Sequence, residues 1–464
     1  MITRQADRGD HSWLLTALAL LTLVVLTACA PPPRVMPDGA APIRLDFPPM
    51  RSFAAASPGP ARRPNAQIAR DFSDLSFQLE SGRPIPVFTR FEGPVTVAFN
   101  GPAPAHLRAD LDGLLARLRA EAGIDIREIT DGDAAIRIEL VPPRQLQRAA
   151  PGAACFVVPR VRDWAALRRN RQSPLIDWTT LQVREQAAVF IPDDATPQEM
   201  RDCLHEELAQ ALGPLNDLYH LPDSVFNDDN MHAVLTGFDM LILRVTYAPA
   251  LRSGMTKAEV MAQVPEILAR INPAGAGGTA PVTAPTTRDW TGAIITALGG
   301  TASRGVRQQA AAHAVAIGQA RGWTGPRQGF AHYVFGRLQI GSDPSLALGA
   351  FNAAIRAYGD DPDLRIHAAH VAAQQAAFAL IARDPEAILA LTGPAITVAR
   401  QHENAALLTV LMMFQAEALD LQGQPEAAMA LRLDSLGWGL YGFGDRQAVI
   451  SRLNEIASLS RLPS

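Results

Sequence analysis

A low-complexity stretch divides this chain into two parts of different character. Residues 272–289 read NPAGAGGTAPVTAPTTRD, and most of them are Gly, Ala, Pro or Thr. Such a composition contains too few large apolar side chains to build a core and is typical of a linker. We therefore predict a linker over residues 273–289 with a separate core on each side. The 464 residues are enough for two domains of ordinary size.

All the segments after this linker favour helices. Three of them begin SDPSLAL, RDPEAIL and GQPEAAM, and their prolines are Pro344, Pro385 and Pro425. A repeat of about forty residues indicates stacked helical hairpins, and this Ala-rich pattern resembles tetratricopeptide-type repeats. We predict an all-α helical-repeat domain over residues 290–464, with a protein partner bound on the repeats. The alternative is an Ala-rich helical bundle without repeats.

Residues 67–272 mix strand and helix patterns, which predicts an α+β domain. A helix is expected over residues 103–123, because its leucines recur at helical spacing and Gly123 follows them. Apolar runs predict four strands, the last of which we place at an edge of the sheet: residues 91–101, 134–142, 153–160 and 185–194.

The N-terminus carries the pattern of an export signal. Arg4 and Arg8 precede the apolar run WLLTALALLTLVVLTAC, which is short for a membrane span and ends at Cys29. Its last residues, LTAC, resemble the bacterial lipobox, in which the Cys is lipidated and becomes the first mature residue. We predict a lipoprotein signal peptide over residues 1–29, with palmitate on Cys29, and a Pro/Ala-rich tether over residues 30–66. An uncleaved anchor helix is the alternative.

These features predict a lipid-anchored protein of the bacterial cell envelope, bound to the membrane through its N-terminus. Ala30 rather than Asp follows the lipobox Cys, which by the usual lipoprotein sorting rule favours the outer membrane, facing the periplasm. A net charge of −4 and the lack of a long basic run argue against a nucleic-acid partner.

The cysteine count agrees with export. One of the three cysteines is used by the lipid, so Cys155 and Cys203 remain as an even pair in an oxidising compartment. A disulfide between these two is the simplest prediction, and two free buried thiols are the alternative.

The residues that bear most on chemistry lie in a helix predicted over residues 197–212. Thr196 is the expected N-cap, Pro197 occupies the first helical position, and Gly213 stands just past the end. Read from His205, the sequence HEELA has a His-Glu pair but lacks a second His one turn later. A zinc site of the zincin type requires that second His.

Read from Glu206, the same helix matches a longer pattern, E-E-x-x-Q-x-x-G-x-x-N-D. It resembles the metzincin motif H-E-x-x-H-x-x-G-x-x-H, in which three His bind zinc and the Glu activates a water molecule. The resemblance places Glu206, Gln210 and Asn216 at the three ligand positions and Glu207 at the catalytic position. The glycine of the motif is also present, whereas every ligand His is replaced.

The resemblance continues downstream. DSVFNDD, with Phe226, stands where metzincins have a Met-containing turn, and LTGFDMLILRVTY follows where their C-terminal helix begins. The chain also resembles a family of bacterial lipoproteins whose central domain has no known function. The shared features are the paired Cys, the EExxQxLGxxND helix and the LTxxDxxxLRxxYxPxLxxGM segment. This resemblance implies a zincin-like fold for residues 67–272 and an envelope location, but no established activity.

The replaced ligands favour a pseudo-metallopeptidase. The amides of Gln210 and Asn216 are poor zinc ligands, so we predict no cofactor, with zinc as the alternative. The nearby His205, His220 and His232 are not placed by the motif. We therefore predict a non-catalytic binding or scaffold lipoprotein. The alternatives are an envelope metal-dependent hydrolase with a non-standard metal shell and Glu207 as general base, and a spacer domain for the repeats.

Overall fold

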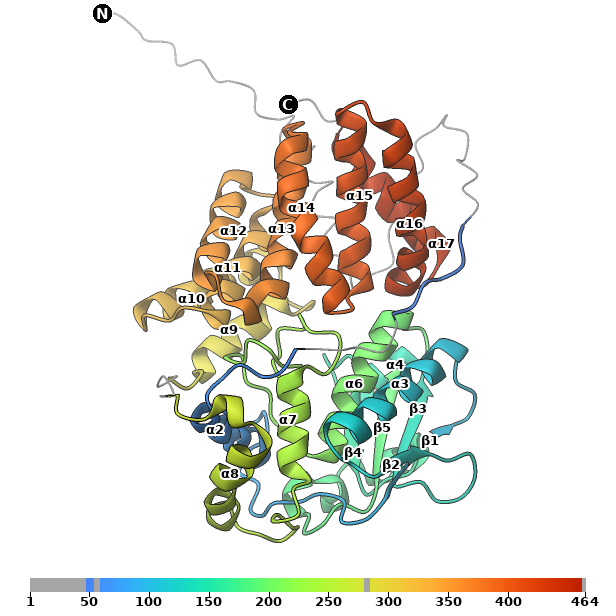
Figure 1. Cartoon of the computed structure of the whole chain (residues 1–464), viewed down its shortest axis with the longest axis vertical. Coiled ribbons are helices and arrows are strands. Elements are labelled where there is room, and N and C mark those ends of the chain that lie inside the picture. Colours follow the sequence, from blue (N-terminus) through green and yellow to red (C-terminus); the bar gives the residue numbers. More distant parts are fainter. Residues whose placement is uncertain (1–46, 54–58, 279–283, 461–464) are drawn as a thin grey trace, which may run out of the picture.

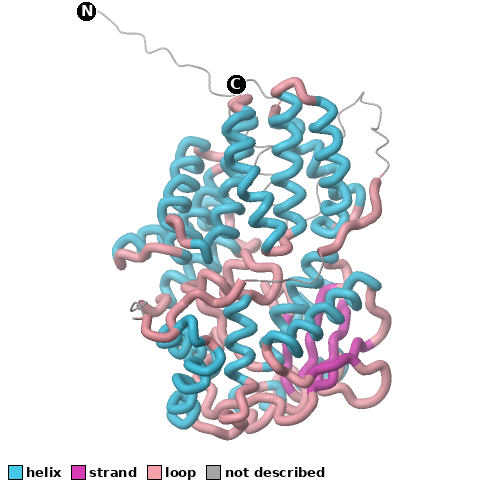
Figure 2. The backbone as a smooth tube through the Cα atoms, viewed as in Figure 1, coloured by secondary structure: helices cyan, strands magenta, loops and turns pink. Residues whose placement is uncertain are grey.

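The computed structural model describes residues 47–53, 59–278 and 284–460. Figure 1 shows two regions that lie one above the other: a central region with a small sheet, and a C-terminal region built of helices. Figure 2 shows the strands gathered on one side of the central region. The predicted order, a mixed region followed by an all-helical region, is confirmed at this level.

The central region contains a five-stranded mixed sheet with the order β2-β1-β3-β5-β4. β4 runs antiparallel to β5, and all other neighbours are parallel. Each predicted strand contains an observed one; β2 was missed because three residues are too few to show a period. The strands are β1 (Val95–Asn100), β2 (Ile126–Glu128), β3 (Ile136–Val141), β4 (Phe156–Pro159) and β5 (Ala187–Pro192).

β5 lies inside the sheet, so its predicted place at an edge is wrong. It pairs with β3 on one side and with β4 on the other. Five of its six residues are buried, because helices cover both faces of the sheet here. A continuous apolar run such as AAVFI is typical of a strand buried on both faces. The short strand β4 forms the edge in its place.

Helices pack on both faces of the sheet. Val189 of β5 shares the larger core with Leu204 and Leu208 of α6, whereas Phe190 points to the opposite face and packs with Trp164 of α5. α6 is therefore held against the sheet beside the edge strand β4. The helices of this region are α2 (Asn65–Ser76), α3 (Ala105–Glu121), α4 (Pro143–Ala149), α5 (Trp164–Asn170), α6 (Pro197–Leu212), α7 (Gly237–Thr246) and α8 (Lys257–Ile271).

The C-terminal region is a stack of helices in which each packs mainly on its neighbours in sequence. The three repeat prolines, Pro344, Pro385 and Pro425, occupy the first position of α12, α14 and α16, where a missing N–H costs nothing. The helices are α9 (Arg288–Leu298), α10 (Arg304–Ala320), α11 (Pro326–Gln339), α12 (Pro344–Tyr358), α13 (Arg365–Ile381), α14 (Pro385–Gln401), α15 (Ala405–Leu421), α16 (Pro425–Phe443) and α17 (Arg446–Leu459).

The segment before α2 contacts both regions. The ring of Phe53 lies 4.6 Å from that of Trp438 in α16, measured between centroids. Further along, Arg63 forms ion pairs of 2.5 Å with Asp71 of α2 and 2.6 Å with Asp223. These residues belong to the stretch assigned to a tether, so part of that stretch packs on the folded body.

Polar contacts join the two regions at the N-terminal half of α6. Arg201 forms an ion pair with Glu403, and both side chains are buried. Gln198 donates to Asn404 at 3.2 Å and accepts from the backbone of Ala406 at 2.8 Å. The helix with the metzincin-like sequence is therefore held by the helical region as well as by the sheet.

No helix in the described part of the chain is both long and apolar enough to cross a membrane. The predicted signal peptide and Cys29 lie outside the described residues, as do residues 279–283 of the predicted linker. The described start of that linker forms the short helix η3 (Pro273–Gly275).

Candidate functional site

The predicted ends of α6 agree with the structure. Thr196 and Glu199 form a capping box: the Thr hydroxyl accepts from the Glu backbone, and the Glu carboxylate accepts from the Thr backbone. Pro197 occupies the first helical position, and Gly213 is the C-cap. These local signals fix where the motif helix begins and ends.

Gly213 is required for close packing and not for a left-handed backbone conformation. Its φ is −164°, which is extended backbone. A Cβ at this position would lie 3.1 Å from Cγ2 and 3.2 Å from Oγ1 of Thr246 in α7. The glycine of the motif therefore allows the end of α6 to pack closely against α7.

A buried arginine completes the C-terminal cap of α6. Arg184 donates from Nη1 to the carbonyls of Gln210 (2.6 Å) and Ala211 (2.7 Å), and from Nη2 to that of Gly213 (2.5 Å). A cation at this end also complements the helix dipole. Burial lowers the pKa of Arg184 to about 10, so the guanidinium stays charged at neutral pH.

The predicted disulfide is present. Cys155 and Cys203 are bonded, and the bridge ties the chain just before β4 to the middle of α6. Glu207 lies one turn after Cys203, and residues four apart share a helix face. Its side chain accordingly turns to the edge strand, where the backbone N–H of Val157 points to its carboxyl group.

Glu207, the candidate catalytic residue, is buried. Only 4% of it is exposed, and its Oε2 has no hydrogen-bond partner. Burial raises the pKa of Glu207 well above its ordinary value, and the neighbouring Glu206 adds to the shift. The Val157 amide opposes this rise only in part. A carboxyl group that is buried and holds its proton more tightly than usual is no ready general base.

The three residues at the ligand positions have different surroundings. The amide nitrogen of Asn216 donates to the backbone carbonyl of Asp74 at 2.9 Å, a contact that holds the turn after α6 on α2. Gln210 is buried, and Glu206 is partly exposed. Within the described part of the chain, no three His, Cys, Asp or Glu side chains are arranged to hold a metal ion.

Zinc therefore does not fit the residues at this position. The one charged ligand among the three, Glu206, has its pKa raised to about 8 by burial and by the neighbouring Asp228 and Glu80. A zinc ligand must be deprotonated, and the two amides beside it are weak donors to zinc. We derive no chemical step through a metal here.

The histidines near the motif serve other contacts. His205 accepts a hydrogen bond at Nδ1 from the backbone N–H of Leu235 at 3.1 Å, and burial keeps its pKa well below 6.5. His220 lies 3.1 Å from a carboxylate oxygen of Asp71. His232 lies 3.0 Å from the carbonyl of Pro222. None of these three contacts is with a residue of the motif.

Carboxyl groups gather beside α6 and form what we call the acidic cluster: Glu80, Glu206, Asp217 and Asp228. Burial and mutual repulsion raise the pKa of Glu206 to about 8 and of Asp228 to about 6, and raise that of Asp217 well above its ordinary value. The side chains of Asp217 and Glu80 are hydrogen-bonded, which requires a proton between them. The cluster therefore holds protons at neutral pH.

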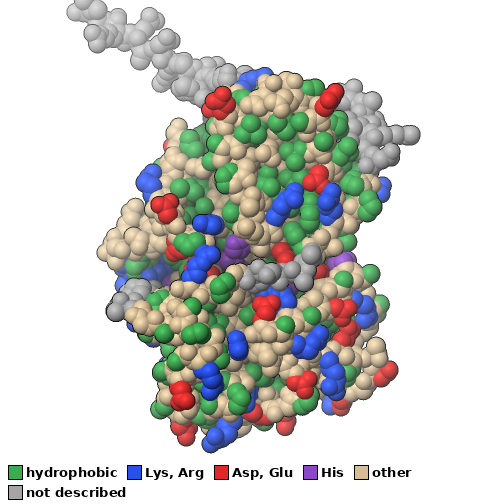
Figure 3. Space-filling model, in the orientation of Figure 1, with side chains coloured by type: hydrophobic (Ala, Val, Ile, Leu, Met, Phe, Trp, Pro, Cys, Tyr) green, Lys and Arg blue, Asp and Glu red, His purple; other side chains and the backbone are tan. Residues whose placement is uncertain are grey.

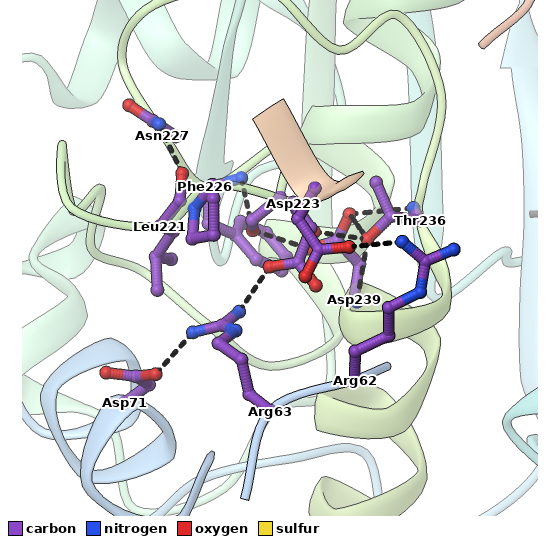
Figure 4. Close-up of polar contacts among 12 residues, drawn as sticks. Arg62, Arg63, Asp71, Leu221, Asp223, Phe226, Asn227, Thr236 and Asp239 are labelled. Atoms are coloured by element: carbon purple, nitrogen blue, oxygen red, sulfur yellow. Dashed lines mark hydrogen bonds and ion pairs between the residues drawn. The ribbon is translucent and has the colours of Figure 1, made fainter. Parts of the chain in front are cut away.

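One buried aspartate fixes the turn before α7, which the sequence resemblance aligns with a Met-turn. Asp239, at the third position of α7, accepts from the Ser224 hydroxyl (2.5 Å), the Val225 amide (3.1 Å) and the Thr236 amide (2.8 Å). Figure 4 shows this network, with Arg63 reaching from the opposite side to Asp223 and Asp71. Phe226 is fully buried beneath the turn.

Sequence reasoning missed Arg184 and Glu80 as neighbours of the motif helix. Arg184 stands thirteen residues before Pro197 in an irregular stretch, and Glu80 lies in a tight turn in which Gly82 N donates to Leu79 O. Neither belongs to a recognisable motif. The Asp228-Asp229 pair was visible in the sequence, but its two side chains point to different partners, Tyr219 and His367.

Comparison with known proteins supplies a family but no activity. The profile of a family described as "Protein of unknown function (DUF2927)" matches residues 65–266. The match runs from α2 into α8 and includes the sheet, the disulfide and α6. No curated protein and no solved structure matches the chain. The central region is therefore similar to a family of unknown function, in agreement with the resemblance drawn from the sequence.

Proposed function

We propose that this protein is a lipid-anchored envelope protein that binds partners through a zincin-like, non-catalytic central domain and through its helical repeats. Cys29 carries the lipid and palmitate in this proposal, and the outer membrane, facing the periplasm, is its location. The predicted domain limits are kept: 67–272 for the zincin-like domain and 290–464 for the tetratricopeptide-like repeats.

The zincin-like assignment has three supports. The segment from Glu206 to Asp217 keeps the spacing and glycine of a metzincin helix. That helix lies on a mixed sheet beside a single antiparallel edge strand, β4. The turn before α7 and the helix itself follow in the expected order. These features support common ancestry, which is a statement about fold and not about activity.

The state of Glu207 carries the non-catalytic proposal. Peptide hydrolysis by this motif needs a carboxylate that takes a proton from water at neutral pH. Here the carboxyl group is buried, burial raises its pKa well above the ordinary value, its Oε2 has no partner, and the residues around it do not fit zinc. The helix has become part of the core between the sheet and the helical region.

Binding surfaces remain on both regions. The acidic cluster gives the central domain a polar site that suits hydrogen-bond donors of a peptide or a glycan. On the helical region, Met429 and Leu433 lie one turn apart on α16 and are 47% and 40% exposed. Two large apolar side chains on one helix face suit a protein partner.

Metal analysis of the full mature chain tests this proposal. We expect zinc well below one atom per chain, both as purified and after incubation with zinc followed by gel filtration. Glu207→Gln replaces a carboxyl group with a strongly raised pKa by an amide of the same shape, so the free energy of unfolding should change by less than about 1 kcal/mol. Complementation of a deletion strain by this variant should be complete.

The competing function is an envelope metal-dependent hydrolase with Glu207 as general base. About one metal ion per chain, together with peptide hydrolysis that Glu207→Gln abolishes, would establish the hydrolase and overturn our proposal. Glu266→Gln on α8 serves as the matched control, because it removes an exposed carboxyl outside the motif and leaves the ligand and catalytic positions unchanged.

A further inference from the structure

Four histidines meet where the central and helical regions join, and we call them the histidine cluster. His232 comes from the loop between α6 and α7, His367 and His370 from α13, and His402 from the residue after α14. The ring centroid of His232 lies 5.8 Å from that of His367 and 5.3 Å from that of His402. In Figure 3 histidine side chains come to the surface along this junction.

One ion pair lies at the centre of the cluster. His367 Nε2 is 2.8 Å from a carboxylate oxygen of Asp229, which belongs to the central region, and the two side chains are 0% and 2% exposed. This buried contact therefore spans the two regions. His232 Nε2 is held by the carbonyl of Pro222, and the Nε2 of His370 is buried without a partner.

We propose that the histidine cluster is a pH-sensitive clamp, which holds the central and helical regions together while its outer histidines are neutral and releases them when these are protonated. The geometry gives the reason. Among the described residues, Asp229 is the only carboxylate in contact with an imidazole of the cluster. Its partner is His367. A proton on His232, His370 or His402 would therefore place a charge in this buried junction without a carboxylate partner.

The other charged and titratable groups around the cluster do not supply such a partner. Arg62, from the segment before α2, faces His402 and is paired with Asp363 at 3.2 Å, and Arg337 of α11 faces His370. From α12, Tyr358 places its ring 5.4 Å from that of His367, and burial raises its pKa well above 10, so it stays neutral. Among the described residues, none of these groups brings a carboxylate into contact with His232, His370 or His402.

The direction of the pH effect follows from the depressed pKa values. Burial, followed by the charge on His367, lowers the pKa of His232 to about 4, and burial with neighbouring cations lowers those of His370 and His402 to about 3. An exposed histidine titrates near 6.5. The clamp is therefore complete above about pH 6.5, and it weakens as the pH falls below that value towards 4. At pH 5 each of the three histidines favours the opened junction by about thirtyfold relative to pH 7.5.

Hydrogen–deuterium exchange of the full chain at pH 7.5 and pH 5.0, corrected for intrinsic exchange rates, tests the clamp. We expect peptides that cover residues 221–236, 362–372 and 398–406 to lose protection at pH 5.0, while peptides from β3 and β5 keep theirs. Equal protection of the junction at both pH values would overturn the proposal. So would a loss of protection in the sheet and the junction together, because that result indicates global unfolding.

Variants distinguish the clamp from a general effect of acid. His402→Gln changes a half-buried side chain that cannot then be protonated, and it should reduce the pH-dependent loss of protection by up to about thirtyfold. His232→Gln is the second variant and should act in the same direction. The control is His313→Gln on α10, whose side chain is exposed and distant in sequence. An equal reduction by the control, or a change in junction protection on adding EDTA at pH 7.5, would contradict a proton-driven clamp.

Discussion

At the scale of single residues, Arg184 fixes the C-terminal end of α6, the helix that carries the candidate site. Its guanidinium binds three backbone carbonyls at the end of α6 and lies 4.8 Å from the ring centroid of Trp178. The last carbonyls of a helix have no partner within the helix, and here they are buried away from water. The Arg184 side chain therefore supplies the hydrogen-bond donors that these carbonyls lack within α6.

Replacing Arg184 by Met should destabilise the protein strongly. The change keeps much of the apolar stem but leaves the carbonyls of Gln210, Ala211 and Gly213 without donors, so we expect a loss of roughly 2–5 kcal/mol in the free energy of unfolding. Urea denaturation measures it. Arg83→Met is the control, because its ion pair with Asp177 is on the surface and should be worth less than about 1 kcal/mol. Equal losses in the two variants would show that Arg184 has no special role.

The sequence was sufficient for part of the candidate site. The caps of α6 at Thr196 and Gly213 could be predicted because N-cap and C-cap signals are local. The partners of the motif could not, because Arg184 and Glu80 reach α6 only through tertiary packing. The raised pKa of Glu207 also depends on burial, which no local pattern reveals.

At the scale of elements, the disulfide connects the edge of the sheet to the motif helix. β4 has only four residues and one strand neighbour, so it has few hydrogen bonds of its own. The bridge from Cys155 to Cys203 holds this strand beside α6 and so positions the backbone amide of Val157 near Glu207. Cysteine counting predicted the pair correctly, on the expectation that an exported chain with one lipidated cysteine has two left to form a disulfide.

Removal of both cysteines, as Cys155→Ala with Cys203→Ala, should lower the free energy of unfolding by roughly 2–5 kcal/mol, as expected for a bridge that closes a loop of this kind. The separation of the cysteines is 48 residues. Denaturation of the variant, compared with wild type under oxidising and reducing conditions, measures the effect. If reduction leaves the wild-type midpoint unchanged, the bridge does not stabilise the fold.

The strands illustrate why element type was easier to predict than element position. Apolar runs in the sequence predicted β1, β3, β4 and β5, because a buried strand consists mostly of apolar residues. The order of strands in the sheet depends on which strands pair, and AAVFIP alone does not give its neighbours. The lack of polar residues in AAVFIP nevertheless indicated a central strand.

At the scale of the whole molecule, several polar contacts join the two regions, among them those of α6 and of the histidine cluster. Arg201 and Gln198 at the start of α6 bind the α14–α15 turn, and Asp229 binds His367 of α13. The sequence predicted the division into two regions from the linker at residues 273–289. It could not predict their contact, because the partners are about 140 to 210 residues apart and charge patterns do not specify such pairs.

The proposed lipid anchor is also tested on the whole molecule. Cys29→Ser should move the chain from the detergent phase to the aqueous phase in phase partition of envelope extracts, because acyl chains supply the membrane affinity. The variant that lacks Cys155 and Cys203 should still partition into detergent, since it keeps the lipidated residue. Detergent partition of Cys29→Ser would show that the apolar N-terminal run anchors the protein without a lipid.

The packing of Phe53 on α16 has a mechanical consequence. In an anchored chain, a force on the N-terminus acts first on the earliest segment that is bound to the folded body. Among the described residues, the earliest such segment contains Phe53 and Arg51, which contact Trp438 and the backbone of Gly437. In the lipid-anchored protein that we propose, tension from the membrane would therefore load the C-terminal helices before α2 or the sheet, and the last helices would shield the central domain from strain.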